Sequence, residues 1–469
     1  MRFRFLDGHR VARDLGAVAL LVLGAGSASP AIAAEPYPAW QQGRPGSVLG
    51  TASQIEIDRK AARIFASKPV QDAIAELTKV YLADDLAQLP GARETARRAA
   101  EANAMSQSIA AVAKDTGRPS AHWATTSAHT WGDVSVPLSG TMIDNPDNIY
   151  RSIPIDGAAS YVIKGQIVFP APAQQTFTLY NQTAGTEKNQ KVRSNLAENG
   201  SLSLNSLVVE RDGSFTITVD ASPANGRPNH LQTDPQARNA SILVRDTLVD
   251  WERENPVQLS VTRVAGPPVA LVPDDAALAR KAAGLTASTA AYYLTWVKNG
   301  TYAGPPNGFT HNFNRVSGWG GIKQGHYLLQ PGEALVVTLD RRNAAYLGFQ
   351  LSDAWGQGQA NDFIARTGSL NAGQAKANKD GTYTFVIAPD DPGVHNWLDT
   401  AGLRAGIYAV RWQQLPQGIT LDDAVRDVRV VKAAELKEVL PPETVWVTPQ
   451  DRKAQQTKRV ADYARRLQL

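Results

Sequence analysis

The spacing of hydrophobic and polar positions divides the chain into helical and β-strand regions. Between residues 52 and 118, apolar side chains recur at helical spacing, as at Ile74, Leu77 and Tyr81. Residues 94–114 contain no proline and are rich in Ala, Arg and Glu, which favour helix. The pattern therefore predicts an N-terminal helical region that packs as a layer on the rest of the protein.

From residue 128 the pattern changes to short alternating runs that are interrupted by Gly, Pro, Asn and Asp. Residues 214–219 alternate polar and apolar side chains and follow the turn sequence Arg211-Asp212-Gly213. Closely spaced strands without intervening helices are typical of a β-sandwich, which we expect at residues 128–266. The expected strands are residues 160–169, 175–180, 214–219, 241–248 and 257–264.

A second helix is predicted at residues 274–298, after the start signal Pro273-Asp274-Asp275. Strands return beyond it, most clearly at residues 334–339, 345–351, 383–387 and 406–413. The tail, residues 419–469, is charged and predicted to be helical, with an interruption at Pro441-Pro442. The fold class is therefore mainly β with helical segments, in which a helix joins two β-domains.

The N-terminus has the features of an export signal. Several arginines precede an apolar run at residues 15–26, which is too short to cross a bilayer comfortably, and Ala31-Ile32-Ala33 fits a signal peptidase site. We expect a signal peptide at residues 1–34, cleavage near Ala33 or Ala34, and a periplasmic or secreted protein. The alternative is a short membrane anchor. No later apolar run reaches the roughly 18 residues of a spanning helix, so stable membrane insertion is not expected.

Composition excludes several kinds of chemistry. The chain has no cysteine, which excludes disulfides, a thiolate nucleophile and cysteine-ligated zinc. The formal net charge is only +4 and the basic residues are dispersed among acids, so nucleic-acid binding is not expected. His311 and His326 lack the close spacing of metal ligands. We expect neither a metal nor another cofactor.

Residues 145–151 form the first candidate site. Asp147, Tyr150 and Arg151 place a carboxylate, a phenol and a guanidinium close together, with the amides of Asn145 and Asn148 beside them. An aspartate next to Tyr or Arg can act as a base with an oxyanion clamp. We predict that the first three are catalytic and that the two asparagines bind ligand. The alternative is an Asx-rich turn that the tyrosine anchors.

Residues 391–400 form the second candidate site. His395 lies between Asp391 and Asp399, with Asn396 and Trp397 adjacent. A histidine held by a carboxylate is a common general base, so His395 is predicted to be catalytic and its four neighbours to bind ligand. The alternative is a structural turn, with the tryptophan in the core and the second aspartate as a cap.

Three further stretches carry a resemblance to a family. Gly348-Phe349-Gln350-Leu351, residues 367–371 and residues 391–402 resemble the domain-of-unknown-function family 1214. Residues 144–150 resemble an N-x-D-T-x-Y element of the same families, with Asn148 at the usual threonine position, and the upstream β-region is similar to the companion family 1254. The resemblance implies an immunoglobulin-like β-sandwich joined to a jelly-roll β-sandwich at residues 299–418, and no established reaction.

Two hypotheses for function follow. The first is an enzyme without cofactor that acts on a small organic molecule in the cleft between the β-domains, where pockets are common. The second is a non-catalytic periplasmic protein that binds a ligand or saccharide, or belongs to the envelope, and uses tryptophan and tyrosine for contact. Trp355 and Asn371 complete the predicted ligand-binding set. The expected partner is a small molecule in both cases.

Overall fold

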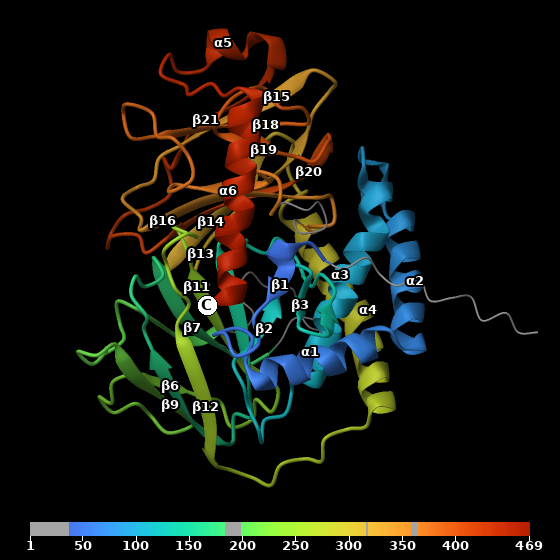
Figure 1. The fold of residues 1–469 in the computed structure, drawn as a ribbon, viewed down its shortest axis with the longest axis vertical. Helices are drawn as coiled ribbons and strands as arrows, with labels where there is room; N and C mark the ends of the chain where they lie inside the picture. The colour runs from blue at the N-terminus through green and yellow to red at the C-terminus, as the bar shows by residue number, and fades with distance from the viewer. Residues whose placement is uncertain (1–36, 183–197, 316–317, 358–363) are drawn as a thin grey trace, which may run out of the picture. The chain divides into compact units, whose positions relative to one another are not determined.

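Two pairs of β-sheets make up most of the computed structural model, which describes residues 37–182, 198–315, 318–357 and 364–469 (Figure 1). The predicted signal peptide at residues 1–34 lies outside the described residues. Residues 37–469 form one unit. The predicted class, mainly β with an N-terminal helical region and a C-terminal helix, is confirmed.

The first sandwich packs a five-stranded sheet, order β2-β5-β11-β7-β8, on a four-stranded sheet, order β10-β9-β6-β12. The strands are β2 (His122–Thr125), β5 (Asn148–Ile155), β6 (Ser160–Gln166), β7 (Gln174–Tyr180), β8 (Glu198–Ser203), β9 (Ser214–Asp220), β10 (His230–Gln232), β11 (Ala240–Thr247) and β12 (Gln258–Ala265). Phe215, Ile217 and Val219 of β9 are buried while the residues between them are not, as the alternation predicts. Their partners in the core include Phe177 and Ile242 from the other sheet.

The second sandwich also pairs a five-stranded sheet, order β13-β14-β20-β16-β17, with a four-stranded sheet, order β19-β18-β15-β21. The strands are β13 (Gly308–Asn314), β14 (Gly320–Leu328), β15 (Glu333–Leu339), β16 (Tyr346–Ser352), β17 (Ser369–Asn371), β18 (Tyr383–Ala388), β19 (Trp397–Asp399), β20 (Ala405–Gln413) and β21 (Val425–Lys432). Phe349 contacts the ring of Phe385 edge-on at 5.3 Å between centroids and that of Tyr408 at 5.9 Å. These rings join the two sheets into one core.

One prediction about the tail is wrong. Residues 425–432, expected to be helical, form the edge strand β21, which runs antiparallel to β15 with Val430 opposite Leu335. The β-branched side chains of Val425, Val428 and Val430 favour the extended backbone, and β15 offers an open edge to pair with. The helix expected further on is present as α6 (Pro449–Gln468). The immunoglobulin-like and jelly-roll topologies stay predictions.

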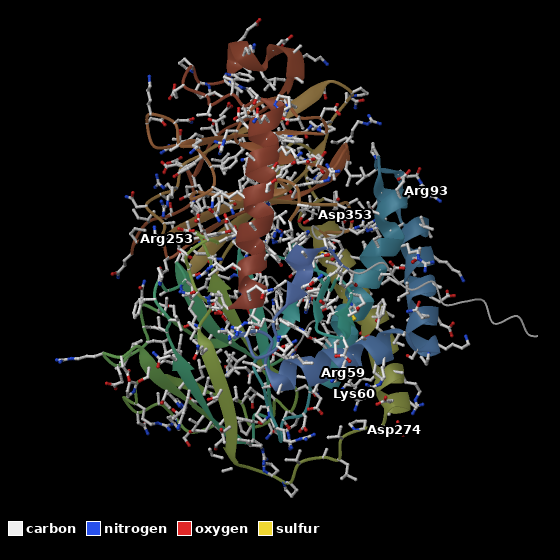
Figure 2. All side chains as sticks on the ribbon, in the orientation of Figure 1. Arg59, Lys60, Arg93, Arg253, Asp274 and Asp353 are labelled. Carbon is white, nitrogen blue, oxygen red and sulfur yellow. The ribbon has the colours of Figure 1, made fainter. Side chains whose placement is uncertain are left out.

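Helices α1 to α4 form a separate layer. The described chain contains α1 (Ala52–Phe65), α2 (Lys68–Ala83), α3 (Ala92–Val112), α4 (Asp275–Asn299), the short α5 (Leu436–Val439) and α6. Helix α4 packs on α2 and α3, where alanines such as Ala99 and Ala282 allow close approach. Lys60 of α1 pairs with Asp275, beside the capping residue Asp274 (Figure 2). No helix among the described residues is long and apolar enough to span a membrane.

A small three-stranded sheet lies next to α1. Its strands are β1 (Gln42–Gly43), β3 (His129–Trp131) and β4 (Val134–Val136). Trp131 donates its indole N–H to the buried carboxylate of Asp58 on α1 at 2.8 Å. The sheet therefore ties the helical layer to the start of the first sandwich.

Asp353 is buried where the helical layer meets the second sandwich. Its Oδ1 accepts hydrogen bonds from the backbone N–H groups of Trp355 and Gln357, both at 2.9 Å. The Trp355 indole donates to the carbonyl of Ala92 on α3 at 2.8 Å and stacks on Tyr81 of α2. Burial raises the pKa of Asp353 to about 7.

We predict that Asp353→Asn makes the unfolding free energy of the protein less sensitive to a rise in pH. The pKa of Asp353 in the folded protein lies above its value in the unfolded chain. The stability that protonated Asp353 contributes is therefore fully present below about pH 4 and is lost as the pH rises through 7. Asparagine keeps an oxygen for both backbone donors and never ionises. The unfolding free energy of the variant minus that of wild type should therefore rise by on the order of 2 kcal/mol between pH 5 and pH 8. Urea unfolding at each pH measures this, and a difference independent of pH contradicts the prediction.

Candidate functional site

A segment of the first sandwich is held by the second. The bridging loop, residues 143–147, directly precedes β5. The carboxylate of Asp147 accepts hydrogen bonds from Tyr346 Oη on β16 at 2.7 Å and from Asn371 Nδ2 on β17 at 2.9 Å. Trp251 Nε1, in the turn after β11 of the first sandwich, donates to the same carboxylate at 2.8 Å. Asp147 therefore bonds at once to two strands of the second sandwich and to a turn of the first.

Burial dominates the electrostatics of Asp147. Only 1% of the residue is exposed, and burial raises its pKa although the bonds from Tyr346 and Asn371 oppose the change. Asn145 adds a further bond by donating from Nδ2 to Tyr346 Oη at 2.8 Å. Both carboxylate oxygens are thus occupied by protein donors, which favours a structural role for this residue.

The backbone of the bridging loop is fixed as well. Arg411 of β20 donates to the carbonyl of Ile143 at 2.5 Å, and Gln350 of β16 donates to that of Asp144 at 2.9 Å. Arg466 of α6 donates to the carbonyl of Pro146 at 3.1 Å. These bonds set the position from which Asp144 and Tyr150 reach a cavity.

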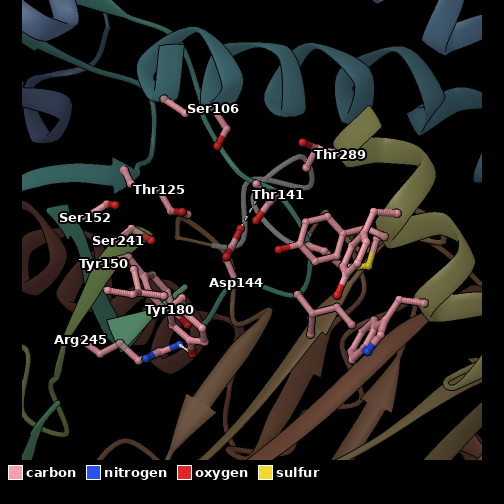
Figure 3. Close-up of a pocket in the computed structure, with 18 of the residues that line it drawn as sticks. Ser106, Thr125, Thr141, Asp144, Tyr150, Ser152, Tyr180, Ser241, Arg245 and Thr289 are labelled. Carbon is pink, nitrogen blue, oxygen red and sulfur yellow. Dashed lines mark hydrogen bonds between the residues drawn. The ribbon is translucent and has the colours of Figure 1, made fainter. Parts of the chain in front are cut away.

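The inner cavity has a volume of about 290 Å³ and is lined by several layers of the fold. Its lining comes from α3, α4, the five-stranded sheet of the first sandwich and that of the second. Figure 3 shows Ser106 from α3, Asp144 from the bridging loop, and Tyr150 and Arg245 from β5 and β11 around this space. The cavity therefore exists only where helices and both sandwiches meet.

Two arginines of the lining share an aromatic neighbour. The guanidinium of Arg245 lies 5.1 Å from the ring centroid of Trp319, and that of Arg315 lies 4.9 Å from it. Arg245 also donates to Thr178 Oγ1 at 3.1 Å and to Tyr180 Oη at 3.2 Å. Both cations are therefore held by neutral groups.

A third arginine, Arg411, completes the cationic side of the cavity. Besides the Ile143 carbonyl it donates to the side-chain oxygen of Gln350, which is again a neutral partner. Among the residues that the structure describes, Arg245, Arg315 and Arg411 form no ion pair. The cationic side is thus built without protein carboxylates in direct contact.

The only carboxylate in the described lining is that of Asp144. It accepts a hydrogen bond from the backbone N–H of Thr141 at 2.8 Å, and burial raises its pKa to about 6. Burial, together with the charges of Arg245 and Arg411, lowers the pKa of Arg315 to about 10. Positive charge is therefore in excess inside a poorly solvated space.

The opposite side of the cavity is aromatic. Tyr292, Tyr293 and Trp296 of α4 line it together with Phe313 of β13. The rings of Trp296 and Phe313 meet edge-on with centroids 6.4 Å apart. The site thus offers a cationic region and an apolar, aromatic region to one occupant.

The structure brings some of the predicted site residues together and separates others. Asn145, Asp147 and Asn371 meet in the bridging-loop network, and Tyr150 lines the inner cavity. Arg151 instead pairs with buried Asp246 at 2.5 Å. The remaining residues predicted to bind ligand are Asn148, Trp355, Asp391, Asn396, Trp397 and Asp399.

Most of these remaining side chains have partners within the protein. Asn148 begins β5, and its buried side-chain oxygen has no hydrogen-bond partner among the described residues, whereas Trp355 belongs to the helical core described above. Asp391 pairs with Arg452 of α6 at 2.9 Å, Asp399 pairs with Arg366 at 3.1 Å, and the Trp397 indole donates to the Ala388 carbonyl at 2.9 Å. Their assignment to a ligand site stays a prediction.

His395 and Asn396 line a separate hollow of about 20 Å³. A hollow of that size has room for about one water molecule. His395 Nε2 lies 3.2 Å from the carbonyl of Gln374, and burial lowers the pKa of His395. His395 and Tyr150 therefore line different cavities. Among the described residues, no group of three or more acidic or histidine side chains is placed to hold a metal.

Four charged residues of the inner cavity were not predicted from the sequence as site residues. They are Asp144, Arg245, Arg315 and Arg411. A usable signal was present, because Arg245 and Arg411 interrupt otherwise apolar strands, and a charge in a buried strand requires a partner or a function. Arg315 stands in a polar and glycine-rich segment and gives no such signal.

One family model and two solved structures are similar to this chain. A family model described as "Protein of unknown function (DUF1214)" matches residues 148–245. This match falls in the first sandwich, which bears Tyr150 and Arg245 and which we expected to resemble the companion family 1254, whereas we expected family 1214 itself at residues 299–418. Among curated proteins none matches the chain.

Two solved structures are similar. An uncharacterized protein from Burkholderia cenocepacia is 23% identical, with a TM-score of 0.63, over 82% of this chain and 100% of that one. A protein from Vibrio parahaemolyticus is 12% identical, with a TM-score of 0.37, over 62% of this chain and 90% of that one. The first shares the fold with this chain.

We predict that Asp147→Asn destabilises the protein, because an amide nitrogen would face the Tyr346 hydroxyl, which already accepts a bond from Asn145. The expected loss is about 1–3 kcal/mol of unfolding free energy. Tyr150→Phe, the matched change in the same segment, removes only the acceptor of a 3.2 Å bond from the Asn145 N–H and should cost less.

Urea unfolding of Asp147→Asn, Tyr346→Phe and the double variant measures their coupling. Residues in one hydrogen-bond network should show an interaction energy of about 0.5 kcal/mol or more. Additive effects, or an Asp147→Asn protein as stable as wild type, would contradict the structural role.

Proposed function

We propose that this protein binds a small organic anion with an apolar or aromatic part, for example an aromatic carboxylate, in the inner cavity. The observation that carries the proposal is the trio Arg245, Arg315 and Arg411, which line one cavity with Asp144 as the only carboxylate in its described lining. Guanidinium groups are well suited to recognise a carboxylate because their paired N–H donors match its two oxygens.

The energetic reason is the cost of buried charge. Like charges in a poorly solvated space repel one another and lose hydration, so an anion that enters between them is favoured. The neutral partners of Arg245 and Arg411 leave part of each guanidinium charge uncompensated. A bound carboxylate would supply the missing negative charge.

The aromatic side of the cavity selects the rest of the ligand. Tyr292, Tyr293, Trp296 and Phe313 offer flat apolar surfaces opposite the cations. A volume of about 290 Å³ suits a compact molecule of one or two rings better than a long chain. With the predicted signal peptide at residues 1–34, we place this activity in the periplasm or outside the cell.

A second candidate function is catalysis on the same anion. The observation that favours it is Asp144, whose pKa of about 6 lets it exchange protons near neutral pH. Tyr150 of the same lining provides a phenol that could complete a proton-transfer pair. In this case the bound anion would be the substrate, and no cofactor is needed for a proton transfer.

The test uses 2-naphthoate and its neutral counterpart 2-naphthamide as probes in calorimetric titrations. Naphthoate should bind at least about tenfold more tightly than the amide, which corresponds to about 1.4 kcal/mol. Arg315→Gln should weaken naphthoate binding by at least about tenfold, with little effect on the amide. Product analysis by NMR in the same samples reveals any turnover.

The matched control is Arg253→Gln, because Arg253 is exposed and outside the cavity lining (Figure 2). It removes the same charge and should leave both affinities unchanged. Equal affinity for naphthoate and naphthamide, or equal weakening by the two arginine substitutions, would overturn the proposal that the cavity recognises an anion.

A further inference from the structure

A second cavity adjoins the inner one. This outer chamber has a volume of about 350 Å³ and lies between α3, β11, the start of α4 and the linker after β12. It shares four lining residues with the inner cavity. They are Ala110 of α3, His122 of β2, Ser152 of β5 and Ser241 of β11. A wall one residue thick therefore separates the two spaces.

The two cavities differ in their exposure to solvent. Lys281, Arg238 and Val269 of the outer chamber are exposed, the last by 44%. Every described residue that lines the inner cavity is buried or half-buried. The lining of the outer chamber is therefore more exposed to solvent than the lining of the inner cavity.

The outer chamber is also cationic. Lys114, Arg238, Arg263 and Lys281 line it, and Asp156 is the carboxylate of its described lining. Arg238 pairs with that aspartate at 2.8 Å. Lys281 forms no ion pair among the residues that the structure describes, and Arg263 donates to the carbonyl of Pro267. The charge of the chamber thus has the same sign as that of the inner cavity.

The shared wall presents small and polar groups. Ser152 and Ser241 bring hydroxyls and Ala110 brings only a methyl group, so little bulk stands between the cavities apart from His122. His122 is only 5% exposed, so its ring is buried in this wall. Burial lowers the pKa of His122 to about 4, which leaves the ring neutral at pH 7. A neutral ring can rotate or donate one N–H without binding an anion as a fixed charge.

We infer that the outer chamber is the entrance through which the anionic ligand reaches the inner cavity, passing between His122 and the two serines. The inference rests on the proposed anion-binding function and adds the route and the means of capture. A cleft lined by one sign of charge raises the local concentration of counter-ions and their association rate. The cations of the entrance should therefore act on the rate of binding more than on the final affinity.

The first experiment follows 2-naphthoate binding by stopped-flow tryptophan fluorescence, for which Trp296 in the inner cavity is the reporter. Lys281→Glu should slow association by at least about threefold at low salt, flatten its salt dependence and leave dissociation nearly unchanged. The control Arg280→Glu makes the same charge change at the neighbouring exposed position of α4, outside the chamber lining. Equal effects of the two variants would contradict a steering role for the chamber.

The second experiment blocks the entrance. Because the chain has no cysteine, Ala270→Cys introduces a unique thiol in the exposed lining of the outer chamber. A biotin maleimide on this thiol, followed by streptavidin, should slow association and dissociation of naphthoate together, each by about tenfold or more, with the equilibrium affinity kept. The same label on Gln417→Cys, in an exposed loop of the second sandwich, should change neither rate.

Unchanged rates in the blocked Ala270→Cys protein would overturn the entrance while leaving the binding function standing. A wild-type protein that binds no naphthoate in the same titration would overturn both. The two failures are distinguished because equilibrium affinity and rates are measured on one sample.

Discussion

The buried carboxylate of Asp147 is the interaction on which the arrangement of the two sandwiches depends. It belongs to the first sandwich, and its two strongest neighbours, Tyr346 and Asn371, belong to the second. A buried charge is costly unless each of its oxygens is bonded, so the two sandwiches are held in the one relative position that satisfies it. A slip of either one would leave the carboxylate with only the Trp251 indole of its own sandwich as a donor.

The inner cavity follows from this constraint. The bridging loop that carries Asp147 also carries Asp144, and Arg411 binds the loop backbone while it lines the cavity. The first sandwich supplies Arg245 and the second supplies Arg315, so the cationic side forms only when both are docked. Stability and recognition are thus coupled, because the same loop that joins the sandwiches places their charges around one space.

Local patterns in the sequence predict the elements well and the site poorly. The strict alternation of residues 214–219 predicts β9 to within one residue, whereas the valines of β21 fit a helical as well as an extended spacing. Asp147 stands out from its neighbours in the sequence, but its partners lie 199 and 224 positions away and cannot be inferred from one chain. The polar composition of residues 391–400 predicts a ligand site. In the structure, Asp391 of this loop pairs with Arg452 of α6, and Asp399 pairs with Arg366.

The most direct measurement of the central claim is a crystal structure of the protein grown with 2-naphthoate. The carboxylate should lie within hydrogen-bond distance, roughly 2.7–3.2 Å, of the guanidinium nitrogens of Arg245, Arg315 or Arg411, with the rings against Trp296 and Phe313. An inner cavity that stays free of naphthoate at saturating concentration would contradict the claim. A naphthoate that binds with its carboxylate turned toward the aromatic side would contradict it equally.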